Sequence, residues 1–266
     1  MIHDLPKKMR SCFNNLVLAG LWCSRGKPIW NNFLKEIISQ VEVLLTEGLF
    51  VDGNHYSFAV TRLVADMPAK ASLLNITKFN GAYGCSLCLQ RGKHQYGKWL
   101  YPLNEDIVMR MHCNHKQHAA KGTLKSPYIG VKGFSPIAAV LPELPLCAPI
   151  DYMHQILLGV TRQIAFAIKQ LLTNAQLNKY SEFVSAIPSV NEITRSPRSM
   201  LDLNYWKASE FKTLLFYTAP VVLKNLINDG FYKLIYALSL GIRLLCEKYI
   251  DNAALRDASS FLITSI

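Results

Sequence analysis

Two cysteines, three residues apart, lie in a long segment that has no periodic hydrophobic pattern. Residues 67–149 are rich in Gly, Lys, His and Pro, and no long run in them follows the helical or the strand period. We expect such a segment to be held together by something other than a core. Cys85 and Cys88, in the stretch "GAYGCSLCLQRG" (81–92), are candidates for half of a zinc site, a redox pair or two small buried residues.

The remaining cysteines and the local composition favour zinc. The chain has seven cysteines, an odd number at scattered positions, which argues against a disulfide framework and indicates a reducing compartment. A redox pair of the thioredoxin kind should open a helix, whereas this stretch is rich in turn-forming residues. The CxxC spacing lets both thiolates reach one tetrahedral ion, so we predict a structural Zn²⁺ that needs two further ligands. A competing set also has metal-like spacing: His112, Cys113, His115 and His118.

Positive charge is concentrated around the same cysteines. The formal net charge is +11, and ten Lys or Arg against two acidic residues place +8 of it between residues 70 and 132. Four histidines and five Tyr or Trp residues are interleaved there, a mixture that suits a surface tracking phosphates and stacking on bases. A solvated basic face is the alternative. The expected DNA-binding residues are Lys70, Lys78, Arg91, Lys93, Lys98, Arg110, Lys116, Lys121, Lys125 and Lys132.

The first 66 residues show a strand, helix, strand pattern. Residues 15–23 form an apolar run that predicts a buried strand, and residues 55–66 alternate into a β-branched run that predicts a second strand. Between them, residues 31–47 carry apolar side chains at the helical period, with Asn31 or Asn32 as the cap and Gly48 as the end. Parallel strands in this order would imply a right-handed crossover.

After residue 149 the pattern becomes helical. Pro220 should kink or split the third of four expected helices. The most apolar run carries Lys233 and Arg243, so no membrane-spanning segment is expected. The expected helices cover residues 151–172, 180–187, 209–227 and 230–250.

Four blocks of the sequence resemble successive blocks of the CACTA (En/Spm-like) DNA transposases, particularly those of animal genomes. They read "LVADMPAKASLL", "GAYGCSLCLQRG", "APIDYMHQILLGVTRQ" and "SPRSMLDLNYWKASEFKTLLFYTAPVVL", and they occur in the family's order. The resemblance implies an α/β fold with a ribonuclease H-like core, DNA cleavage and strand transfer with Mg²⁺ or Mn²⁺, and a nuclear location. It divides the chain into a partial core (1–68), a basic, zinc-binding Cys/His insertion (69–149) and a helical continuation of the core (150–266). Self-association into a homo-oligomer is left open.

The resemblance also implies the site residues. Asp66 matches the second catalytic Asp and Glu210 the third acidic residue, which together with a first Asp would hold two divalent ions. Each has a structural alternative, Asp66 as the cap of a helix starting at Met67 and Glu210 as a first-turn carboxylate behind Ser209. For zinc, the family pairs the CxxC with a DxxH motif. Cys85 and Cys88 would then share the ion with His154, and Asp151 would be a ligand or support His154.

One part of the family pattern has no counterpart in the sequence. The block that "HDLPKKMRSCFNNLVLAGLW" resembles follows the strand bearing the first catalytic Asp, and neither Asp4 nor Asp52 fits that strand. We therefore expect a transposase-derived chain that is clipped at both ends and inactive in strand cleavage. The alternative is a non-catalytic DNA-binding or scaffold remnant supported by zinc.

Overall fold

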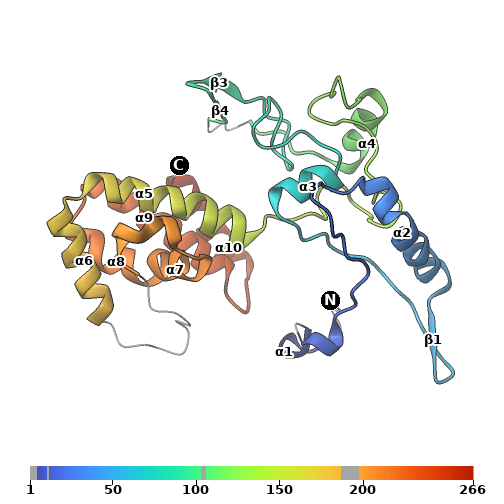
Figure 1. The fold of residues 1–266 in the computed structure, drawn as a ribbon, viewed down its shortest axis with the longest axis horizontal. Helices are drawn as coiled ribbons and strands as arrows, with labels where there is room; N and C mark the ends of the chain where they lie inside the picture. Colours follow the sequence, from blue (N-terminus) through green and yellow to red (C-terminus); the bar gives the residue numbers. More distant parts are fainter. Residues whose placement is uncertain (1–4, 11, 103–105, 187–197, 266) are drawn as a thin grey trace. The chain divides into compact units, whose positions relative to one another are not determined.

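The computed structural model describes residues 5–10, 12–102, 106–186 and 198–265, which belong to two compact units, 1–149 and 150–266 (Figure 1). The boundary falls where the sequence becomes helical. We call them the first and the second unit. Among the described residues, no helix combines the length and the apolar character needed to cross a membrane. The elements of the first unit are α1 (Lys7–Arg10), η1 (Phe13–Asn15), α2 (Trp30–Glu47), β1 (Leu49–Val51), β2 (Asn54–Tyr56), α3 (Met67–Leu73), β3 (Lys93–Gln95), β4 (Lys98–Leu100) and α4 (His112–Lys121).

The helix that the periodicity predicts near residue 31 is present as α2. It begins at Trp30 with Ile29 in the cap position, so Asn31 and Asn32 lie inside the helix and the prediction that one of them caps it is wrong. Gly48 follows the last turn with a φ of 72°, a conformation that glycine adopts without strain, and its N–H donates to the Leu44 carbonyl at 3.1 Å.

The strand predicted over 15–23 does not form. Residues 16–23 are irregular, with no strand beside them among the described residues, and Val17 and Leu18 are 86% and 81% exposed. The end of this run packs on α2, where the Trp22 ring meets the Phe33 ring edge-on at 5.8 Å. The run has the apolar composition of a buried strand, but a strand also requires a neighbour for its backbone N–H and C=O groups.

The second predicted strand, 55–66, is correct only at its first residues. β2 pairs with β1 in an antiparallel hairpin whose turn is formed by Asp52 and Gly53, and residues 57–66 leave the sheet. Part of that run packs into the core instead, where Leu63 N–H donates to the Cys147 carbonyl at 2.9 Å. Two two-stranded antiparallel hairpins, β1–β2 and β3–β4, are the sheets found in the described residues. A ribonuclease H-like core therefore stays a prediction.

The expectation that residues 67–149 are held together by something other than a core is wrong, because most of the hydrophobic core of the first unit comes from this segment. Helix α3, part of α4, the irregular segment 131–148 and one face of α2 contribute to this core. Polar contacts fix the irregular segment onto α3: Ser135 Oγ–H donates to the Leu73 carbonyl at 2.6 Å, and Lys132 N–H donates to the Asn75 carbonyl at 2.8 Å. The fully or nearly buried apolar residues are Ala71, Leu73, Leu74, Ile76, Ala119, Val131, Ile137, Leu141, Leu144, Cys147 and Ala148.

The described part of the second unit is helical, and its core is formed mainly by Leu, Ile, Val, Met and aromatic side chains. The predicted helix over 151–172 is present as η2, a π-helical segment, continued by α5. The predicted 180–187 helix starts earlier because Thr173 and Gln176 form a reciprocal cap, and residue 187 lies outside the described residues. The elements are η2 (Tyr152–Thr161), α5 (Arg162–Leu171), α6 (Asn174–Ala186), η3 (Met200–Tyr205), α7 (Ala208–Thr213), η4 (Leu214–Thr218), α8 (Ala219–Val222), η5 (Leu223–Asn225), α9 (Asp229–Leu245) and α10 (Asn252–Thr264).

Pro220 splits its helix, as predicted. The run over 209–227 is divided into α7, the π-helical η4, α8 and η5, and the proline lies in the first turn of α8. A proline has no N–H for the carbonyl four residues earlier, which here is that of Phe216. The guanidinium of Arg243, on α9, donates to this carbonyl and lies over the Phe216 ring. A charged residue from a neighbouring helix thus replaces the missing backbone donor.

Candidate metal centre and nucleic-acid interface

The cysteine loop of the first unit, residues 81–88, is held by hydrogen bonds between its backbone and the side chains of Tyr101 and Arg110. The Tyr101 hydroxyl accepts from Gly84 N–H at 2.8 Å and donates to the Gly81 carbonyl. Arg110 Nε–H donates to the Cys85 carbonyl at 3.0 Å. Gly84 is required here, because a Cβ at this position would lie 2.4 Å from the Lys78 carbonyl oxygen. These contacts hold residues 81–85 in one conformation without regular secondary structure.

The two cysteine side chains lie together in this loop. Leu87 N–H donates to the Cys85 Sγ at 3.4 Å, and Cys88 is buried where it pairs with Met109 in an isolated β-bridge. Burial raises the pKa of the Cys88 thiol, and the neighbouring Cys85 thiol raises it further. Two adjacent thiolates repel each other, and a bound cation removes that cost. The pair therefore fits half of a zinc site, with two sulfur ligands and a sulfur-directed N–H donor already in place.

The competing histidine set lies on α4, which carries His112, Cys113, His115 and His118. Burial, with a further contribution from the charge of Arg110, lowers the pKa of His115 to about 4, and the pKa of His118 is lowered for the same two reasons. Both imidazoles are therefore neutral at pH 7. Their Nδ1 atoms and the Nη1 of Arg110 are buried without a hydrogen-bond partner. The charge of Arg110 acts on both histidines and disfavours a second cation at this neutral set, which has no thiolate pair to offset it.

In the second unit, Asp151 and His154 form a defined pair. Asp151 caps η2, since its Oδ1 accepts from Met153 N–H at 2.9 Å and His154 N–H at 3.3 Å. Its Oδ2 lies 2.6 Å from His154 Nδ1. Burial alone would raise the pKa of Asp151, but hydrogen bonds from His154 outweigh it and lower that pKa. A carboxylate that accepts from Nδ1–H leaves Nε2 with its lone pair, the arrangement found behind many zinc-bound histidines. The geometry favours Asp151 as a support for His154 over Asp151 as a ligand.

Asp66 has its carboxylate engaged at the start of α3. Its Oδ1 accepts from Ala69 N–H at 2.8 Å, and Pro68 stands in the first turn of the helix. This is the capping arrangement weighed as the alternative to catalysis. Asp66 does not end a strand, because residues 57–66 form none. The role of Asp66 as a catalytic ligand stays a prediction that this local geometry does not favour.

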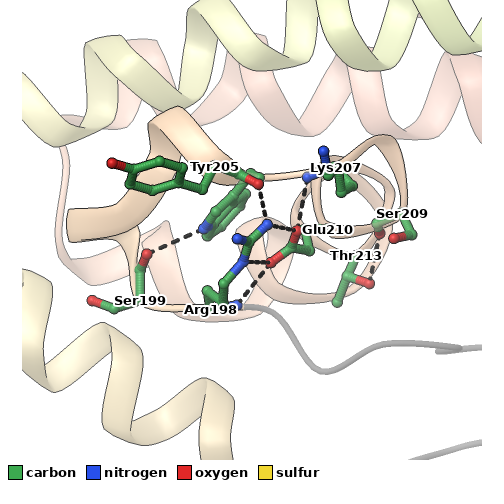
Figure 2. A network of polar contacts seen from close by, with 8 residues as sticks. Arg198, Ser199, Tyr205, Lys207, Ser209, Glu210 and Thr213 are labelled. Atoms are coloured by element: carbon green, nitrogen blue, oxygen red, sulfur yellow. Dashed lines mark hydrogen bonds and ion pairs between the residues drawn. The ribbon is translucent and has the colours of Figure 1, made fainter.

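Glu210 is fully buried, and both of its oxygens are taken (Figure 2). Oε1 accepts from the Arg198 backbone N–H and Nε–H at 3.1 and 2.9 Å, while Oε2 accepts from Arg198 Nη2–H at 2.6 Å and Lys207 N–H at 2.7 Å. Burial alone would raise the pKa of Glu210, but the hydrogen bonds from Arg198 and Lys207 lower it to about 2. Ser209 lies inside α7, so the expectation that it caps this helix is wrong, and Lys207 takes the cap position. A metal ion could reach Glu210 only after Arg198 moved away.

The ten predicted DNA-binding residues divide into two groups. Lys70 and Arg110 are buried, and each donates to backbone carbonyls, Lys70 to that of Pro149. Direct DNA contact by these two residues stays a prediction that this geometry does not favour, because interior side chains are not placed to reach a phosphate. Lys132 is half-buried. The exposed residues are Lys78, Arg91, Lys93, Lys98, Lys116, Lys121 and Lys125.

Sequence reasoning missed the residues that organise these sites, namely Tyr101, Arg110 and Arg198. The local sequence indicates a surface charge for Arg110, within the basic segment 70–132, and gives Arg198 no role beyond its place in the block that begins "SPRSM". No group of three or more His, Cys, Asp or Glu side chains in the described ranges is arranged to hold a metal ion. Protein-family models, curated proteins and solved structures were compared with the chain, and none matches it. The case for function therefore rests on the residues themselves.

Proposed function

We propose that this chain is a transposase-derived protein that binds DNA through its first unit and does not cleave it. The observation that carries the proposal is the set of seven exposed Lys and Arg side chains between residues 78 and 125, in the unit that also holds the cysteine loop. Phosphate backbones bind such surfaces by releasing condensed counterions. The four-block resemblance to CACTA transposases supports DNA as the partner and the nucleus as the compartment.

A structural zinc is part of the proposal. Cys85 and Cys88 would supply two ligands and His154 a third through Nε2, with Asp151 fixing the imidazole through Nδ1. The ion would neutralise the two thiolates and keep the cysteine loop ordered. Hydrogen bonds to Tyr101 and from Arg110 hold the same loop within the protein. The zinc and these hydrogen bonds together would fix the start of the basic segment that follows the loop.

Strand cleavage with Mg²⁺ or Mn²⁺ is the less supported reading of the same resemblance. It requires free carboxylate oxygens on at least two residues, because each hard cation takes several oxygen ligands. In this structure Asp66 caps α3 and Glu210 is held by Arg198. Cleavage by Asp66 and Glu210 would therefore require both networks to open.

The test is the salt dependence of duplex binding, followed by fluorescence anisotropy with labelled DNA. We expect affinity to fall steeply with salt, with a slope of about −0.9 per neutralised phosphate. Reversing Arg91, Lys93 and Lys98 to Glu should weaken binding at least tenfold and flatten the slope by about 2 to 3. A matched control reverses three exposed lysines of the second unit, Lys179, Lys224 and Lys248. Equal losses in both variants would show a nonspecific charge effect and contradict the proposal.

A further inference from the structure

The two β-hairpins of the first unit have the same architecture but different residues at their tips. Each has two three-residue strands joined by a two-residue turn. In β1–β2 the turn is Asp52 and Gly53, with φ values of 49° and 79°, and in β3–β4 it is Tyr96 and Gly97, with φ values of 51° and 74°. Both turns have positive φ at both central residues, as type I′ turns do. The first hairpin therefore serves as an internal reference for the second.

Tyr96 is an unfavourable residue for its position. Asp, Asn and Gly tolerate the left-handed conformation of the first turn residue, whereas a bulky side chain there is an outlier. The side chain is also 95% exposed, so packing within the described structure does not offset the strain. A strained and exposed aromatic residue, where the sister hairpin has Asp, indicates a contact made outside the chain.

The residues behind the tip indicate the chemistry of that contact. Cross-strand pairing places Lys93, Gln95 and Lys98 on one face of the ribbon and His94 with Trp99 on the other. The His94 and Trp99 rings meet edge-on at 5.3 Å. Residues 91–100 contain three basic side chains and no acidic one. An anionic polymer whose repeating units have flat faces matches this combination better than a protein surface does.

A cavity at the base of the hairpin extends the same surface. It has a volume of about 630 Å³ and is lined in part by Arg91, Lys93 and Asp106. The two cationic residues that line it are also the first two of the basic series that continues to Lys98. A strand following this series would have phosphates beside Arg91 and Lys93 and a base near the hairpin tip.

We propose that the β3–β4 hairpin is a base-stacking finger for DNA with unpaired bases. Tyr96 stacks on the face of an unpaired base, while Arg91, Lys93 and Lys98 bind the phosphates of the same strand. Inside a duplex, neighbouring base pairs stack and cover the faces of each base, so a ring at a hairpin tip finds a free face mainly on an unpaired base. The inference rests on the proposed DNA binding and narrows it to one element and one class of DNA.

The experiment compares wild type with Tyr96→Asn and Tyr96→Phe. Asn suits the turn better than Tyr, so the melting temperature of Tyr96→Asn should be unchanged or higher, which excludes unfolding as a cause of lost binding. The probes are a mixed-sequence single-stranded oligonucleotide, the blunt duplex of the same sequence, and that duplex with a single-stranded tail. Binding is followed by anisotropy over a range of salt concentrations.

We expect Tyr96→Asn to weaken binding of the single strand and of the tailed duplex by about 5- to 100-fold, the loss found when one stacked aromatic is removed. The salt slope should stay the same, because no charge is lost. Tyr96→Phe, which keeps the ring, should stay within about twofold of wild type, as should binding of the blunt duplex by Tyr96→Asn.

The outcomes separate this inference from the proposed function. If the wild-type protein binds none of the three probes, the proposed function fails. If it binds them and Tyr96→Asn binds equally well, the proposed stacking role of Tyr96 is wrong, while the proposed DNA binding is retained. If Tyr96→Asn weakens blunt-duplex binding as strongly as single-strand binding, stacking on unpaired bases is wrong.

Discussion

Glu210 and Arg198 are joined by two side-chain hydrogen bonds, at 2.9 and 2.6 Å, with the carboxylate fully buried and the guanidinium 38% exposed. The same guanidinium also donates to the Tyr205 carbonyl (Figure 2), and the Trp206 Nε1–H donates to the Ser199 carbonyl at 3.1 Å. The pair therefore connects residues 198–199 to the segment that leads into α7. A carboxylate in this position acts as a structural anchor.

The first prediction concerns pH. Because the folded-state pKa of Glu210 is lowered from 4.5 to about 2, the pair contributes stability that is fully present above pH 4.5 and is lost as the pH falls toward 2. We expect a contribution of about 2 kcal/mol, less than the full pKa difference implies, because water screens the partly exposed guanidinium. Urea unfolding followed by helical circular dichroism at pH 5 and pH 3 measures the part of this contribution that is lost between these two pH values.

Glu210→Gln is the matched variant for that experiment. It keeps the size of the side chain and removes the titrating group, so its stability should change less between pH 5 and pH 3 than that of the wild type. An identical pH dependence in the two proteins would assign the acid sensitivity to other carboxylates.

The second prediction concerns zinc. Purified wild-type protein should contain about one zinc per chain, as four-ligand structural sites do, while Cys85→Ser and His154→Ala should lose most of it. Asp151→Asn should lower zinc affinity by about 10- to 100-fold, because Asp151 orients the imidazole without binding the metal. Metal analysis and a chelator competition decide both points.

Two controls accompany the metal analysis. Cys246→Ser changes an exposed cysteine far from the motif in sequence, and His118→Ala tests the competing α4 set. Equal zinc in wild type, Cys85→Ser and His154→Ala would refute the site, whereas loss only in His118→Ala would assign it to α4.

The third prediction is that Asp66 stabilises α3 as a cap. Asp66→Ala should lower the free energy of unfolding by about 1 kcal/mol, because Ala69 N–H loses its acceptor, whereas Asp66→Ser should retain most of the stability. Thermal melts of the three proteins at pH 7 are sufficient. Equal melting temperatures for Asp66→Ala and wild type would show that the cap contributes nothing.

The fourth prediction is that the chain lacks strand cleavage and strand transfer activity. The two-metal reaction needs carboxylates that hold both ions, and the two candidates are engaged within the protein. The assay incubates the protein with Mg²⁺ or Mn²⁺ and end-labelled duplex carrying candidate transposon ends. Cleavage by the wild type that disappears in Asp66→Ala would overturn this prediction and restore the catalytic reading.

Features that depend on nearby residues were predictable from the sequence, while features that depend on distant partners were not. Helix α2 and its end at Gly48 follow from local periodicity and backbone preference, and so does the split at Pro220. Residues 15–23 have the composition of a strand, but pairing depends on a neighbour that no local pattern specifies.

The candidate sites show the same division. The CxxC and DxxH spacings were visible in the sequence, and so was the capping alternative for Asp66. The burial of Arg110 was not, because a surface arginine and one that binds the carbonyls of a loop 25 residues away look the same in a linear sequence. Likewise, "YG" at 96–97 becomes informative only once the backbone shows that Tyr96 has a left-handed conformation, at the turn position where the β1–β2 hairpin has Asp52.

The exposed run at residues 16–18 has a practical consequence for all of these measurements. Apolar side chains on an irregular, unpaired backbone make a surface to which a second molecule can add, and this tendency grows with concentration. Self-association should therefore increase with protein concentration. Light scattering across a dilution series sets the concentration below which binding and unfolding curves report on single molecules.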